Sequence, residues 1–229
     1  METGGHILSS FDNALKELRE KTIAMGSGSQ RNLENAMRGL IDRDKDLCNQ
    51  TIADDDDEDQ LEIEIDRMGM DLIIKFRPLA TDLRMVIGSM KTSSHLERIS
   101  DQAVSIAKRA RKIIKHPEVI ELSQIEGLYQ VAAEMLSSSL IAYADNDTAL
   151  ALEVIKKEKT LKKTHKVTSR ALSEKLELES AYYRDYLDLV FICRWLERVG
   201  NLATNIAEDV IFEETSADIR HGGELPPQL

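Results

Sequence analysis

The chain has 229 residues, of which 42% are hydrophobic, so it is long and apolar enough for one or two domains with a real core. Its formal net charge of -11 argues against nucleic acid, whose binding depends on Lys and Arg displacing counterions, and against direct attachment to anionic lipid. It has no apolar run of the ~18 residues that a membrane span needs and no basic-then-apolar leader. Cys48 and Cys193 form no CxxC pair. The sequence therefore predicts a cytoplasmic protein with reduced, half-buried thiols.

Apolar residues recur at helical spacing along almost the whole chain, and no segment shows the alternating pattern of a strand. In the first half, the Gly-Ser stretch at 25–29 predicts a break, because Gly and Ser weaken helices. Six consecutive acids at 54–59 predict a helix start, because carboxylates favour the positive end of the helix dipole. The helical segments predicted in this half are 8–23, 33–47, 61–73, and a helix after Pro78 that carries 83–107 and ends near His116.

The second half repeats this plan. Its predicted helices are 125–141, 149–178 and 187–212, with turn chemistry at 145–147. The fold class expected is all-α, with two tandem three-helix bundles related by an internal repeat. The expected domains are an N-terminal three-helix bundle at 1–116, a C-terminal three-helix bundle at 117–215, and a flexible tail at 216–229.

One helical phrase occurs twice, a hundred residues apart. Residues 96–107 read LERISDQAVSIA and residues 196–207 read LERVGNLATNIA, with six of twelve positions identical. Such self-similarity indicates one structural unit present twice. Glu97 and Asp101 in the first copy, and Glu197 and Asn201 in the second, stand four residues apart. Each pair therefore lies on one helix face, away from the apolar stripe.

Carboxylates at this spacing can hold a hard or borderline metal ion, and Asp55 and Asp59 form another such pair with Glu62 one turn on. The alternative is a solvated polar face, which acids at this spacing commonly form. His95 points elsewhere on the helical wheel and is interpreted as incidental. No His follows a Glu at Glu-x-x-His spacing, which argues against a ferritin-like di-iron oxidase. No phosphate-binding loop, zinc-finger spacing or G-x-S-x-G elbow is present, so no enzyme is expected.

These phrases together resemble the PhoU family of phosphate-uptake regulators. The stretches that carry the resemblance span nearly the whole chain, in tandem order: 77–84 (RPLATDLR), 96–101 (LERISD), 196–201 (LERVGN), 205–208 (NIAE) and 218–221 (DIRH). The resemblance implies two three-helix bundles and a long first helix running through the Gly-Ser stretch. It also implies metal clusters on E/D-x-x-x-D motifs in each half. It implies a cytoplasmic negative regulator, dimeric by family analogy, that contacts a phosphate ABC transporter ATPase and a sensor histidine kinase.

Carried over residue by residue, the resemblance implies metal ligands at Asp55, Asp59, Glu97 and Asp101 in the first half. In the second half Glu197 matches, while Asn201 stands where the family usually has Asp. Glu158 and Lys162 stand where the family has an acid pair, and a protonated lysine repels a metal ion. We therefore expect divalent or trivalent metal ions, iron or zinc, bound more weakly or not at all in the second half.

Two functions remain open at this stage. The first is a regulator of phosphate uptake and phosphate-starvation signalling that works through protein contacts, with Arg98 and Arg198 as candidate partner-binding residues. The second is a stand-alone metal-binding or metal-storage helical bundle.

Overall fold

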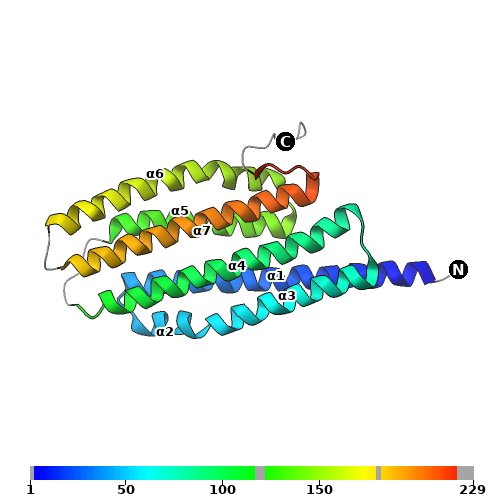
Figure 1. Ribbon diagram of the computed structural model, residues 1–229, viewed down its shortest axis with the longest axis horizontal. Coiled ribbons are helices and arrows are strands. Elements are labelled where there is room, and N and C mark those ends of the chain that lie inside the picture. The colour runs from blue at the N-terminus through cyan, green and yellow to red at the C-terminus, as the bar shows by residue number, and fades with distance from the viewer. Residues whose placement is uncertain (1–2, 117–121, 179–181, 221–229) are drawn as a thin grey trace.

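The computed structural model describes residues 3–116, 122–178 and 182–220, and it contains no strand within these ranges. They fold into helices α1 (Thr3–Ile41), α2 (Lys45–Ala53), α3 (Asp55–Phe76), α4 (Ala80–Ile113), α5 (Ser123–Asp145), α6 (Thr148–Leu178) and α7 (Tyr183–Thr215). Figure 1 shows α1, α3 and α4 as one long bundle, with α2 at one end, and α5, α6 and α7 as a second bundle beside it. The predicted all-α fold of two tandem three-helix bundles is confirmed. The short helix α2 was not predicted as a separate element.

The predicted break at 25–29 is wrong, because α1 runs through it as the family resemblance implied. The two glycines there leave room for side chains of neighbouring helices. A Cβ at Gly26 would press on Leu140 of α5, and one at Gly28 would overlap the carboxylate of Glu58 on α3. The Ser29 hydroxyl donates to the Met25 carbonyl at 3.1 Å, one turn back, so its hydrogen bond is made within the helix.

The acidic run begins a helix, as predicted. Asp55 is the first residue of α3, and all four residues of its first turn are acidic. The preceding helix, α2, begins with a side-chain cap, because the Asp44 carboxylate accepts from the backbone N–H groups of Asp46 and Leu47. The chain leaves α3 at Arg77, whose φ of 50° is left-handed, and Pro78 prevents the helix from continuing.

The repeated phrase lies where the two bundles meet. Its apolar side chains are buried in both copies, and each Leu, Ile and Val among them contributes roughly 1.5–3 kcal/mol relative to an exposed position. α4 and α7 lie side by side (Figure 1). They run antiparallel, since Lys91 contacts Asp209 while Arg109 contacts Phe191. A shift of Lys91 by 100 positions gives Phe191, and a shift of Asp209 back by 100 gives Arg109. The two contacts are therefore made by equivalent positions of the two halves. The repeat therefore relates the two ends of this interface.

Cys48 and Cys193 are free and fully buried, where half-buried thiols were expected. Most of the predicted tail at 216–229 lies outside the described residues; the part inside them places Ile219 in the core with 9% exposure. None of the helices, over the residues described, is long and apolar enough to cross a membrane.

Candidate functional site

The first-half acids lie on α3 and α4, near enough for each to affect the pKa of another. The pKa of Glu97 is raised to about 7, first by burial and then by the negative charges of Asp101, Glu62 and Asp59. The pKa of Asp55 is also raised, again by burial first and then by Asp101 and Asp59. The predicted ligands of this half thus repel one another across the α3–α4 interface. Like charges held in this way favour a bound cation.

The same acids do not form a closed cage. In the described part of the chain, no three His, Cys, Asp or Glu side chains are grouped so that they could hold a metal ion. Asp59 and Asp101 are exposed and Glu97 is only partly buried. The donor set fits a hard cation in its chemistry, because it consists of carboxylates on two facing helices. The side chains would need to draw closer around such an ion.

The second-half positions are arranged differently. Lys162 lies 2.8 Å from the carboxylate of Glu158, so a cation of the protein already sits where the family resemblance implied an acid. The carboxylate of Glu197 lies 3.4 Å from the His165 ring. The Oδ1 atom of Asn201 is buried and has no hydrogen-bond partner. The structure therefore does not bring Glu197, Asn201 and Glu158 together as an acid cluster like that of the first half.

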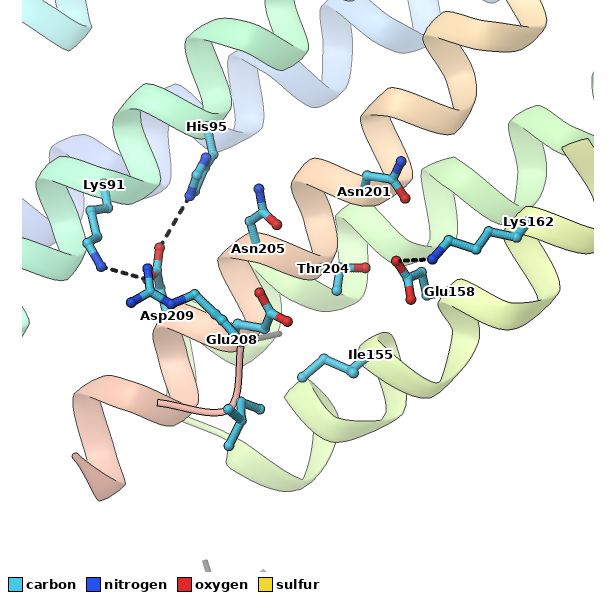
Figure 2. Close-up of a pocket in the computed structure, with 12 residues that line it drawn as sticks. Lys91, His95, Ile155, Glu158, Lys162, Asn201, Thr204, Asn205, Glu208 and Asp209 are labelled. Atoms are coloured by element: carbon cyan, nitrogen blue, oxygen red, sulfur yellow. Dashed lines mark hydrogen bonds and ion pairs between the residues drawn. The ribbon is translucent and has the colours of Figure 1, made fainter. Parts of the chain in front are cut away.

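A pocket of about 790 Å³ opens beside Lys162 and Asn201. Its walls come from α4, α6 and α7, and Ile219 and Arg220, which follow α7, also line it. Figure 2 shows Lys91 and His95 reaching from α4 toward the carboxylate of Asp209 on α7. Lys91 Nζ is 3.1 Å from Asp209 Oδ1, and His95 Nε2 is 3.3 Å from Asp209 Oδ2. His95 Nδ1 is buried without a partner.

His95 therefore lines this pocket and contacts Asp209, which its interpretation as incidental did not foresee. A wheel drawn on its own helix could not show this, because the residue that it meets lies 114 positions later. The useful signal was Lys91, one turn before His95, which puts two nitrogen groups on the same face of α4. The lining lysines and arginine are matched in number by Glu158, Glu208 and Asp209, so the pocket is polar without a strong net charge.

Arg98 and Arg198 are both exposed, as expected for partner-binding residues. Neither side chain forms an ion pair with another described residue. They occupy equivalent positions of the repeat, on α4 and α7. Each is thus available to a partner on its own bundle.

Sequence reasoning missed a buried polar cluster that joins the bundles. Glu213 of α7 is 1% exposed and lies 3.4 Å from Arg19 of α1. Arg19 also donates to the carbonyl of Tyr143 at 2.6 Å and to Asn146 Oδ1 at 2.7 Å, both at the end of α5. A Cβ at Gly88 of α4 would overlap the Glu213 carboxylate, so glycine is needed for this close approach. No local pattern marks residues so far apart in sequence.

Known proteins resemble this chain over nearly its full length. The PhoU domain family matches residues 22–110 and 125–210. A phosphate-specific transport system accessory protein PhoU homolog of Pseudomonas aeruginosa is 32% identical over 95% of this chain and 90% of its own. The corresponding protein of Zymomonas mobilis is 35% identical over 92% and 89%, and that of Escherichia coli is 28% identical over 95% and 90%.

Solved structures agree with these matches. The crystal structure of PhoU from Pseudomonas aeruginosa superposes with a TM-score of 0.87 at 30% identity, covering 90% of this chain and 99% of that one. The phosphate transport system regulatory protein PhoU from Streptococcus pneumoniae gives 0.84 at 24% identity, covering 91% and 98%. This second likeness concerns the fold alone.

Proposed function

The chain belongs to the PhoU family, and on that premise we propose that it is a negative regulator of phosphate uptake and of phosphate-starvation signalling. It acts by contacting the ATPase of a phosphate ABC transporter and a sensor histidine kinase. The observation that carries the proposal is the pair of PhoU domains, matched at 22–110 and 125–210 and folded as two bundles in contact. Relatives over nearly the same length are named accessory proteins of phosphate-specific transport.

The role we propose is not catalytic. Burial raises the pKa of the Cys48 thiol to about 11 and that of Cys193 to about 12, so neither is a thiolate near neutral pH. The net charge of -11 works against direct control of DNA. Regulation then passes through protein surfaces, and we place the protein in the cytoplasm, where an ATPase and a kinase domain can be reached.

We further propose that Asp55, Asp59, Glu97 and Asp101 hold a divalent or trivalent metal ion, iron or zinc. A cation there would neutralise carboxylates that now raise one another's pKa and would tie α3 to α4. In the second half the ammonium group of Lys162 takes the place of a metal ion, because it offsets the charge of Glu158. The metal therefore has a structural role in one bundle only.

The coupled acids also support a second candidate, a stand-alone metal-binding or metal-storage protein. Deletion of the gene separates the two. Under the regulator proposal, a phosphate-starvation reporter becomes active in high phosphate and is repressed again by the wild-type gene. An unchanged reporter and unchanged phosphate uptake, together with altered metal tolerance, would support storage instead. Light scattering on the purified chain tests the homodimer that the family analogy implies.

A further inference from the structure

Arg109 of α4 lies against two aromatic rings of α7. Its guanidinium carbon is 4.1 Å from the centroid of the Phe191 ring and 5.3 Å from that of Trp195, and the two rings stack at 6.0 Å. The guanidinium also donates to the carboxylate of Asp188. We call Arg109, Phe191 and Trp195 the aromatic platform. Because its side chains hold one another, little conformational freedom is left to lose on binding.

The platform continues into an exposed apolar row on α7. Tyr183, Leu187 and Phe191 follow one another at four-residue spacing and are 46%, 42% and 36% exposed. Single exposed apolar side chains are ordinary on any protein surface. A row of three that joins a stacked Trp and Arg has the composition of the residues that dominate protein–protein binding energy.

Positive charge gathers at the Phe191 end of this row. At about 100° per residue, Arg194 and Arg198 lie within about 60° of Phe191 on the wheel of α7. Both are exposed, as is Lys112, one turn beyond Arg109 on α4. None of the three forms an ion pair with another described residue. The nearby acid Asp188 is already bound by Arg109, which leaves Asp101 as the exposed acid on this side of α4. The surface is thus locally basic in a chain of net charge -11.

The other end of the α4–α7 interface shows that the rings are not required by the repeat. The contacts of Asp209 with Lys91 and His95 correspond, through the 100-residue shift, to those of Arg109 with Phe191 and Trp195. At that end the equivalent positions are polar and line a pocket. The aromatic side chains are therefore specific to this end, where packing of the two helices alone does not explain them.

We propose that the aromatic platform, with Leu187, Arg194 and Arg198, is a docking surface for an acidic segment of a protein partner that seats an apolar side chain against Phe191. This rests on the proposed function and assigns a surface to one of its partner contacts. A basic surface on an acidic protein attracts an acidic partner by complementarity. An anionic membrane fits less well, because the rest of the chain would be repelled by it. A second copy of the platform would bring like charges together.

Binding of the purified full-length chain to the purified transporter ATPase, and to the cytoplasmic part of the sensor kinase, tests this proposal. The platform variant carries Phe191→Ser, Arg194→Glu and Arg198→Glu. Its matched control carries Val167→Ser, Lys163→Glu and Lys166→Glu on α6, all exposed positions. We expect the platform variant to bind one of the two proteins at least roughly tenfold more weakly, while the control stays near wild type. Circular dichroism melting of both variants excludes loss of folding as the cause.

Acid-to-Lys changes in the partner segment, located by cross-linking from position 191, should restore binding to the platform variant. Wild-type-like binding of the platform variant to both proteins overturns the docking surface and leaves the regulator proposal standing. Failure of the wild-type chain to bind either protein, with an unchanged reporter on gene deletion, overturns both. Platform-dependent binding to vesicles of phosphatidylglycerol and phosphatidylcholine, or platform-dependent self-association, would assign the surface to lipid or to a second copy and so overturn the proposal.

Discussion

Arg19 and Glu213 stand 194 residues apart in the chain and 3.4 Å apart in the fold, with only 1% of Glu213 exposed. Burial raises the pKa of Glu213 to about 8 in spite of the Arg19 charge, which lowers it. The carboxyl group that joins the two bundles is thus largely protonated at neutral pH. The bundles are held by a hydrogen-bonded cluster whose charge depends on pH.

The first prediction follows from this pKa. Below about pH 4.5, the ordinary value for Glu, the carboxyl is protonated in both the folded and the unfolded chain. Between about 4.5 and about 8 the folded chain keeps a proton that the unfolded chain releases, so the free energy of unfolding falls as pH rises. Glu58 and Glu97, each with a pKa raised to about 7, act in the same direction. Glu213→Gln should match wild type at pH ~5 and exceed it by about 1–3 kcal/mol at pH ~8. Urea unfolding at the two pH values measures this, and an equal loss at both would contradict it.

The second prediction concerns the close approach of α1 to α3. Gly28→Ala should lower the free energy of unfolding by about 1–3 kcal/mol, because the added methyl group overlaps the buried Glu58 carboxylate. Gly127→Ala on α5 is the matched control. A Cβ there meets nothing within 4 Å, and alanine should stabilise that helix by about 0.5–1 kcal/mol. Denaturant unfolding of both variants measures the two changes in the free energy of unfolding. A stabilised Gly28→Ala protein would show that Glu58 does not occupy this position.

The third prediction tests the metal site of the first half. Glu97→Ala with Asp101→Ala should remove bound iron or zinc, because it deletes two of the four proposed ligands. Asp56→Ala with Asp57→Ala is the control, since both acids are exposed in the same run but lie outside the proposed ligand set. Elemental analysis of protein purified without added metal provides the measurement. Equal metal content in all three proteins would rule the site out.

The fourth prediction tests the asymmetry of the halves. Lys162→Asp with Asn201→Asp should raise the metal stoichiometry, because it removes the cation that now pairs with Glu158 and adds two carboxylates beside the pocket. Lys163→Asp, on an exposed neighbouring position, should leave the stoichiometry unchanged. Tight and equal occupancy of both halves in the wild-type chain would refute the charge argument.

Much of the fold could be predicted from local patterns. The spacing of apolar residues located the helices because burial of one helix face leaves a periodic trace, and the repeated phrase predicted two bundles. Asp55, Asp59, Glu97 and Asp101 were predicted to share a metal site, which stays a prediction; in the structure Asp101 raises the pKa of Asp55 and Asp59 raises that of Glu97.

The features that could not be predicted depend on contacts between residues far apart in sequence. The Gly-Ser stretch resembles a break until Leu140 and Glu58 are seen to occupy the space that side chains would fill. His95 acquires a role through Asp209, and Arg109 through Phe191. Propensity and periodicity describe one helix at a time, so they carry no information on which helix lies opposite.

The antiparallel contact of α4 with α7 has a consequence for how this chain can vary. In a symmetric pair of identical one-bundle chains, every interface substitution would appear twice, once on each side of the two-fold axis. In a single fused polypeptide the two copies of each contact are encoded separately and can diverge. Lys91 with Asp209 and Phe191 with Arg109 are made by equivalent positions of the repeat, as an ion pair at one end and a cation–ring contact at the other. The single chain thus carries two different chemistries at equivalent positions, which an exact two-fold pair of identical chains could not do.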